Sequence, residues 1–289
     1  MTRTTAFITL VMLCALSASG QPSQQIVPIQ SRVYRLFDIS QCDTAYNGNP
    51  YRLYIARPKA PDANKEKTPV LYMLDGNGQF PMLLNQLTEA PANFPLIVGI
   101  GYPSDMAYPR ERVRDYTIPI EGSEEGGGAE TFYRFLCETV KPFIEKNYPV
   151  DTTRQTLCGH SHGGLFVLYV AFRHTPAFRH YLAASPSLWW GNGKIVPTSR
   201  PLFPSPPQSI TITLGEYEEN PLLDKSPRQL PAGIKKQRQS DVSARDLHQL
   251  IAKESPNARF ILYEGKTHGS SIPGFLQEAI RIAAGNTAE

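Results

Sequence analysis

The sequence predicts an α/β fold: a mainly parallel, doubly wound sheet with helices on both faces. Short apolar runs typical of buried strands alternate with segments of helical periodicity, and this alternation favours parallel strands connected by helices. A glycine-bounded turn at residues 159–163 lies between one such strand and one such helix. Neither composition nor charge changes abruptly along the 289 residues, so we expect residues 21–289 to form a single domain.

The amino-terminal half is expected to begin with an antiparallel pair of strands over residues 31–40 and 51–57, joined by the turn-rich residues 43–50. We place this pair at the edge of the sheet. Two short apolar runs, residues 69–74 and 95–101, are typical of buried parallel strands and are expected to follow in the sheet.

Residues 102–128 contain prolines, arginines and a glycine cluster without apolar periodicity, which predicts a long ordered loop. Apolar residues at helical spacing over 129–144 then predict a helix that Pro142 kinks or divides. The remaining strands are expected at 154–158, 181–185, 209–214 and 259–263. The remaining helices are expected at 165–172, 242–251 and 275–282.

Residues 1–20 have the parts of a secretory signal peptide. Arg3 supplies positive charge, residues 6–16 are apolar, and residues 18–20 are small, so cleavage is expected near Gln21. The apolar run is too short to span a membrane comfortably, so we expect a periplasmic protein without stable membrane insertion. A retained amphipathic anchor is the alternative.

The charge and the cysteines limit the possible functions further. A formal net charge of +3 without a cluster of basic residues argues against nucleic-acid binding. Loss of residues 1–20 leaves Cys42, Cys137 and Cys158, and three thiols cannot all pair within one chain. Cys158 is expected to be a buried free thiol, so Cys42 with Cys137 is the candidate disulfide.

Ser161 is the candidate nucleophile, because it stands at the centre of a G-x-S-x-G turn between a strand and a helix. Such a turn strains the serine backbone and requires very small neighbours two residues away, which Gly159 and Gly163 provide. The alternative is that Ser161 only caps the following helix.

His268 is the candidate general base, because a serine hydroxyl needs a base to accept its proton and His268 follows the last expected strand. Strand ends at that edge share the side of the sheet on which Ser161 projects. His160 and His162 flank the nucleophile and are expected to point away from its hydroxyl. They lack a third ligand at a suitable spacing, so we expect neither a metal nor a cofactor.

Glu218 is the candidate for the carboxylate that orients His268, because it follows the strand that ends at Leu214 and lies between nucleophile and base in the chain. Its neighbours offer alternatives, namely Glu216, Glu219 and Asp224. A Ser-His dyad without a carboxylate is a further alternative.

The oxyanion of the tetrahedral intermediate is expected to accept hydrogen bonds from two backbone N–H groups, those of His162 and Asn77. His162 follows the nucleophile. Asn77 lies in the glycine-rich segment after the strand at 69–74, which is also consistent with an ordinary turn.

Five segments together resemble the putative-esterase family of α/β-hydrolases, which includes feruloyl esterases, S-formylglutathione hydrolase and bacterial siderophore esterases. They are residues 70–77 (VLYMLDGN), 110–117 (RERVRDYT), 142–148 (PFIEKNY), 159–164 (GHSHGG) and 185–190 (SPSLWW). The resemblance implies the α/β-hydrolase fold over roughly residues 51–276. Within that family the LDGN, RERVRDYT and SPSLWW segments are most similar to periplasmic trilactone siderophore esterases, which implies hydrolysis of enterobactin-type esters.

A ferric tricatecholate is a compact trianion with aromatic faces, so its binding needs positive charge and stacking surface. Arg110 and Arg114, with Arg112 between them, could supply the charge, and Trp189 and Trp190 the surface. Solvated arginines and ordinarily packed tryptophans are the alternatives. A carbohydrate or feruloyl-type esterase, an acyltransferase and a non-catalytic binding protein that retains the fold are the competing functions.

Overall fold

The computed structural model describes residues 24–59, 67–90, 93–225 and 240–285. The proposed signal peptide lies outside these residues. The strands are β1 (Phe37–Tyr46), β2 (Asn49–Pro58), β3 (Thr68–Met73), β4 (Leu96–Gly101), β5 (Val150–His160), β6 (His180–Ala184), β7 (Ser209–Gly215) and β8 (Ala258–Tyr263). The α-helices are α1 (Gly76–Gln86), α2 (Glu111–Tyr116), α3 (Ala129–Phe135), α4 (Lys141–Asn147), α5 (His162–His174), α6 (Glu216–Glu219), α8 (Ala244–Ala252) and α9 (Ile272–Ala283).

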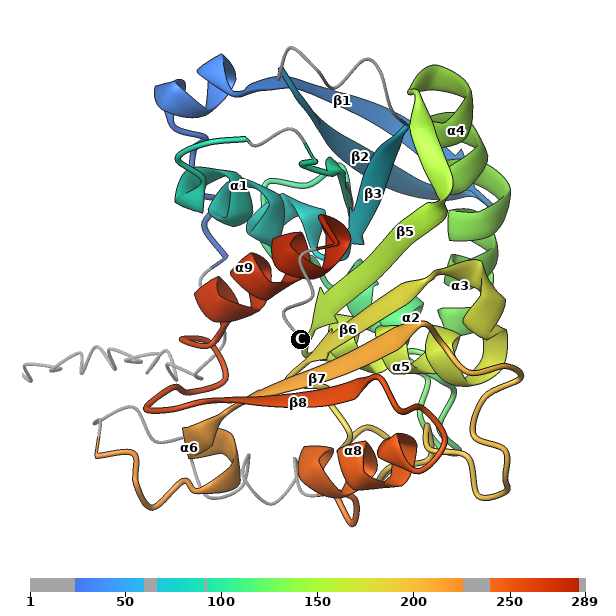
Figure 1. The fold of residues 1–289 in the computed structure, drawn as a ribbon. Coiled ribbons are helices and arrows are strands. Elements are labelled where there is room, and N and C mark those ends of the chain that lie inside the picture. Colours follow the sequence, from blue (N-terminus) through green and yellow to red (C-terminus); the bar gives the residue numbers. More distant parts are fainter. Residues whose placement is uncertain (1–23, 60–66, 91–92, 226–239, 286–289) are drawn as a thin grey trace, which may run out of the picture.

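The strands form one eight-stranded sheet in the order β1-β2-β4-β3-β5-β6-β7-β8 (Figure 1). β2 runs antiparallel to both of its neighbours, β1 and β4. The other six strands are parallel to one another and lie in the order β4, β3, β5, β6, β7 and β8. The carboxyl ends of these six strands therefore meet at a single edge, where loops from distant parts of the chain converge. The predicted fold class is confirmed.

Helices cover both faces of the sheet (Figure 1). α1 and α9 pack on one face, where Met73, Phe80 and Phe275 belong to one apolar cluster. α5 and α8 cover the other face, and α2 and α3 pack against α5 and each other. Tyr72 lies in this second cluster although it is next to Met73, because successive side chains of a strand point to opposite faces. No helix among the described residues is both long and apolar enough to cross a membrane.

The structure corrects the expected first hairpin. β1 begins later in the chain than expected and β2 is longer than expected. The two strands pair in register from Phe37 with Pro58 to Tyr46 with Asn49, so only Asn47 and Gly48 form the turn. Both turn residues have positive φ, as the Asn-Gly pair of a tight hairpin requires. Residues Ser31–Arg35 form a short 3₁₀ helix instead of the start of a strand.

Three helices occur where the sequence predicted none, namely α1, α2 and the four-residue α6. The sequence did not indicate α1, because the first turn of this helix contains glycines and Pro81 lies inside it. Glycine and proline are both typical of turns. α2 lies within the segment 102–128 that was expected to be a loop, and its six residues are too few to show a period. The expected break near Pro142 is present: the π-helical turn Leu136–Val140 separates α3 from α4.

Candidate active site

Ser161 occupies the sharp turn between β5 and α5, with φ of 62° and ψ of −119°. The close packing of this turn explains its glycines. A Cβ on Gly159 would lie 2.6 Å from the carbonyl of Gly163, and one on Gly164 would lie 2.6 Å from the carbonyl oxygen of Ala184. The backbone that holds Ser161 therefore has the strained geometry expected for a nucleophile elbow.

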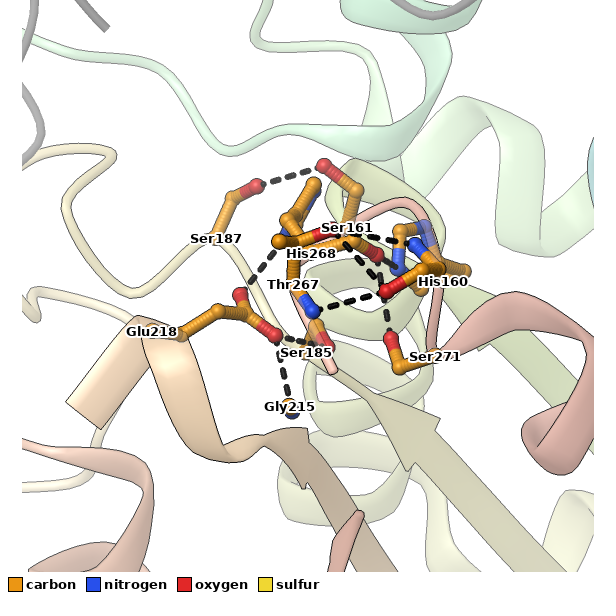
Figure 2. Close-up of polar contacts among 10 residues, drawn as sticks. His160, Ser161, Ser185, Ser187, Gly215, Glu218, Thr267, His268 and Ser271 are labelled. Atoms are coloured by element: carbon orange, nitrogen blue, oxygen red, sulfur yellow. Dashed lines mark hydrogen bonds and ion pairs between the residues drawn. The ribbon is translucent and has the colours of Figure 1, made fainter. Parts of the chain in front are cut away.

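The hydroxyl of Ser161 lies at the carboxyl edge of the sheet, where Figure 2 shows its polar surroundings. The Oγ of Ser161 lies 3.1 Å from Oγ of Ser187, and the two hydroxyls form a hydrogen bond. Among the described residues no hydrogen bond joins Ser161 Oγ to His268, and the contact between a nucleophile and its base is commonly loose before substrate binds.

His268 follows β8, as expected, and its Nδ1 lies 2.6 Å from Oε2 of Glu218. A carboxylate only accepts, so Nδ1 of His268 carries the proton and Nε2 is left with the lone pair that a general base needs. In the view of Figure 2 the His268 ring lies between Glu218 and Ser161. The side chain of His268 is 40% exposed, which leaves it accessible to substrate.

Glu218 lies in the short helix α6, directly after β7. Its Oε1 accepts hydrogen bonds from Ser185 Oγ at 2.7 Å and from the N–H of Gly215 at 2.9 Å. Burial raises the pKa of the Glu218 carboxyl, but the charge that His268 carries when protonated and the hydrogen bonds to the carboxylate outweigh it, so the pKa lies below its ordinary value. Glu218 is therefore an ionised acceptor at neutral pH.

The neighbouring carboxylates make different contacts. Glu216 accepts a hydrogen bond from the N–H of Gly265, and Glu219 forms a bidentate ion pair with Arg245. Of the glutamates in this segment, Glu218 is the one whose carboxylate reaches His268.

His160 supports His268 from the buried side of the site. Its Nε2 donates to the carbonyl oxygen of His268 at 2.9 Å, and the two ring centroids are 4.5 Å apart. Burial, together with the charge of His268, lowers the pKa of His160 well below its ordinary value, so this ring stays neutral. Ser271 Oγ donates to the same carbonyl oxygen at 3.0 Å.

The two expected oxyanion donors lie at helix starts. His162 is the first residue of α5 and Asn77 the second residue of α1, and the first N–H groups of a helix have no acceptor within the helix. The side chain of Asn77 is buried and anchors the end of β4, because it accepts from the N–H of Tyr102 and donates to the carbonyls of Tyr102 and Ser104.

A buried ion pair connects the segments that carry these two donors. Arg112 of α2 donates to both carboxylate oxygens of Asp75 at 2.6 and 2.8 Å, and its Nη1 is 3.3 Å from Nδ1 of His162. The side chains of Arg112 and Asp75 are only 12% and 1% exposed. Asp75 immediately precedes α1, so the pair holds the start of α1 close to the start of α5.

Residues 44–253 match the family described as "Putative esterase". The chain belongs to this esterase family. The ferri-bacillibactin esterase BesA of Bacillus subtilis is 32% identical over 81% of this chain and 84% of its own. A siderophore enterobactin esterase of Emericella nidulans is 34% identical over 61% of this chain and 68% of its own. The solved siderophore hydrolase EstA of Aspergillus nidulans superposes with a TM-score of 0.73 at 26% identity, covering 91% of this chain and 99% of that one. The protein is a serine hydrolase that acts on carboxylic esters.

The arginines expected to bind substrate in this esterase differ in their surroundings. Arg110 is 91% exposed, and Glu125 is 3.7 Å away. Arg114 is 38% exposed, and its guanidinium donates to Asp115 and to Asn49 at the start of β2. Arg110 is therefore the side chain whose charge is most available to a ligand.

The two tryptophans also differ. Trp190 is buried, and its indole N–H donates to the carbonyl oxygen of Ile118 at 2.9 Å, so it holds the 102–128 segment in place. Trp189 is partly exposed, and its ring lies 5.4 Å from that of His162 in an edge-to-face arrangement. Trp189 thus presents an aromatic surface beside His162, the residue that follows the candidate nucleophile.

Among the residues that the structure describes, no three potential ligands come together as a metal site. Cys42 and Cys137 are free thiols, and Cys158 is a buried one, so the candidate disulfide does not form in this structure.

Sequence reasoning missed the hydroxyls of Ser185 and Ser187 and the pairing of Arg112 with Asp75. The signal for the serines was available: the SPSLWW segment directly follows β6 and therefore begins at the edge where Ser161 projects.

Proposed function

We propose that this esterase is exported to the periplasm and hydrolyses the ester bonds of catecholate trilactone siderophores of the enterobactin type, with or without Fe(III), so that iron is released. The observation that carries the proposal is the identity of 32% with a ferri-bacillibactin esterase over most of both chains. The enterobactin esterase and the siderophore hydrolase among its other relatives support the same substrate class.

The geometry supports acyl transfer through Ser161. Nε2 of His268 takes the hydroxyl proton as Oγ attacks the ester carbonyl, and Glu218 stabilises the imidazolium that forms. The N–H groups of His162 and Asn77 donate to the resulting oxyanion. Collapse of the intermediate expels the alcohol of the cleaved ester, which receives the proton from His268.

The second half of the reaction uses water. His268 removes a proton from a water molecule, which attacks the ester carbonyl of acylated Ser161, and the free acid leaves as Oγ regains its proton. Each step moves a proton or an acyl group only, so no cofactor is required. One ester bond of the substrate is cleaved in each turnover.

Two side chains, one at the start of α2 and one beside the start of α5, suit a trianionic aromatic ligand. Arg110 supplies an exposed positive charge, and Trp189 supplies an aromatic face beside His162. A carbohydrate or feruloyl-type esterase is the competing assignment, and it would require a neutral cleft that binds sugar.

Mass spectrometry of the products tests the substrate. Wild-type enzyme and Ser161→Ala are incubated in parallel with enterobactin, ferric enterobactin and a feruloylated sugar. We expect linearised trimers and smaller fragments of enterobactin from the wild type and none from Ser161→Ala. Preferential cleavage of the feruloylated sugar would replace the siderophore assignment, and binding of siderophore without turnover would indicate a non-catalytic binding protein.

Amino-terminal sequencing tests the export. Protein recovered from the periplasmic fraction of an expressing Gram-negative host is expected to begin near Gln21. A chain that retains residues 1–20 in the membrane fraction would favour the alternative of an amphipathic anchor.

A further inference from the structure

One tripeptide, Ser185-Pro186-Ser187, contacts the site at two points. It follows β6, and the backbone just before it and at its last residue is bound to Ser161: the Ser161 N–H donates to the carbonyl of Ala184 at 2.9 Å, and the Ser187 N–H donates to the carbonyl of Ser161 at 3.1 Å. The N–H of Ser185 donates to Thr213 of β7 at 2.7 Å. The tripeptide is therefore held against both the turn of Ser161 and the strand that leads to Glu218.

The two serine hydroxyls diverge toward opposite ends of the proposed triad (Figure 2). Ser187 Oγ lies 3.1 Å from Oγ of Ser161, and Ser185 Oγ donates to Oε1 of Glu218 at 2.7 Å. Ser185 and Ser187 are each only 2% exposed, so their hydroxyls are largely shielded from hydrogen bonding with solvent. Buried hydroxyls are costly unless they are paired, and here the partners are the nucleophile and the carboxylate.

The backbone of Ser185 adds an independent argument. Its φ is +41°, in the left-handed region that strains any side chain and that glycine adopts most easily. A serine at this position is disfavoured by the backbone, so its presence points to a use for the hydroxyl.

We propose that Ser187 and Ser185 are positioning residues of this esterase, the first acting through Ser161 and the second through Glu218. Attack requires the Ser161 proton to pass to His268, so in the reactive complex Ser187 is the donor and Ser161 Oγ the acceptor of their hydrogen bond. That bond fixes the direction of the Ser161 hydroxyl and strengthens as negative charge develops on Oγ. Ser185 holds one oxygen of Glu218 so that the other reaches Nδ1 of His268. The inference rests on the proposed roles of Ser161, His268 and Glu218.

Ser187→Ala tests the first role with a neutral p-nitrophenyl ester and a fluorophosphonate that labels the nucleophile. We expect kcat and the rate of labelling to fall about tenfold to a hundredfold with KM nearly unchanged, because one hydrogen bond to a developing charge is lost. Ser187→Thr keeps the hydroxyl and should recover most of the activity. Ser209→Ala is the matched control, since it removes a buried hydroxyl that pairs with His180 at the opposite edge of the sheet.

Ser185→Gly tests the second role and separates it from a structural one. The glycine relieves the positive φ but also deletes a hydrogen bond to Glu218, and these two effects on stability oppose each other, so resistance to urea should change little while kcat falls about tenfold. In a Glu218→Gln background the same substitution should change kcat less than twofold, because Ser185 acts through the carboxylate.

Rates are divided by the amount of enzyme that the fluorophosphonate labels at completion, so that partial unfolding does not count as lost catalysis. Wild-type rates per labelled site in Ser187→Ala and Ser185→Gly would overturn the inference. An additional tenfold loss for Ser185→Gly in the Glu218→Gln background would overturn the role of Ser185. Hydrolysis by Ser161→Ala would instead overturn the proposed function.

Discussion

Oε2 of Glu218 lies 2.6 Å from Nδ1 of His268, while its other oxygen is held by Ser185 and by the N–H of Gly215. Both carboxylate oxygens thus accept hydrogen bonds, and the His268 ring cannot rotate without breaking a short charge-assisted hydrogen bond. This arrangement favours a Ser-His-Glu triad over a dyad.

Glu218→Gln should therefore lower kcat by about three to four orders of magnitude, because an amide oriented like the carboxylate cannot stabilise the imidazolium and favours the wrong tautomer of His268. Steady-state kinetics with a p-nitrophenyl ester measure the loss. Glu219→Gln is the control, since Glu219 pairs with Arg245 and should leave kcat within twofold of the wild type. A loss below tenfold in Glu218→Gln would indicate a dyad.

The buried pair of Arg112 with Asp75 should be essential for stability. Arg112→Leu leaves the Asp75 carboxylate buried without its counter-ion, and we expect the free energy of unfolding to fall by about 3–5 kcal/mol. Combining Arg112→Leu with Asp75→Asn removes the unpaired buried charge and should recover part of the lost stability. Urea denaturation measures both variants.

A second effect of this substitution concerns the site. Because Arg112 also contacts His162, Arg112→Leu should lower kcat of the fraction that stays folded. Arg57→Leu breaks an ion pair with Asp38 whose side chains are 55% and 47% exposed, and it should change stability and kcat little. Equal effects of the two arginine substitutions would contradict a special role for the buried pair.

The alternation of strands and helices was enough to predict the architecture from the sequence, because buried strands and amphipathic helices leave periodic apolar patterns. α1 escaped prediction for a physical reason. Its glycines resemble turn signals, but Gly76 is required by packing: a Cβ there would lie 2.8 Å from the carbonyl carbon of Gly99 in β4. A pattern along the chain cannot distinguish a glycine needed by a neighbouring strand from one needed by a turn.

The positions of Ser161, Glu218 and His268 could be predicted because each follows the end of a parallel strand, and such ends meet at one edge. The partners of Arg112 could not be predicted, because Asp75 lies 37 residues away and His162 lies 50 residues away in the chain. The sequence also did not indicate that Arg112 is buried while Arg110 is exposed. The six residues of α2 are too few to show by their periodicity which face of the helix packs against the protein.

The charge of Glu218 should make stability depend on pH. Its pKa in the folded protein is lower than in the unfolded chain, so its contribution is complete above the ordinary carboxyl pKa of about 4.3 and is lost as the pH falls through the lower folded value. Glu218→Gln removes this contribution. We therefore expect the wild type to exceed Glu218→Gln in unfolding free energy most at neutral pH, with the difference shrinking on acidification.

Urea denaturation over a series of pH values from neutral to about 3 measures this difference. Glu124→Gln, in an exposed loop, is the matched control and should follow the wild-type curve. A difference between wild type and Glu218→Gln that stays constant over the whole series would mean that the ionised form of Glu218 is not favoured by folding.

Arg110 and Arg114 should contribute unequally to the binding of an anionic substrate. Arg110→Ala removes an exposed charge, and we expect KM for ferric enterobactin to rise about fivefold or more while KM for a neutral p-nitrophenyl ester is unchanged. Arg114→Ala should raise it less, because Asp115 and Asn49 already engage that guanidinium. The Arg110 effect should shrink as salt is added, because exposed charges are screened within about 10 Å at 0.1 M ionic strength. Equal changes in KM for the charged and the neutral substrate would exclude Arg110 as the group that attracts the siderophore.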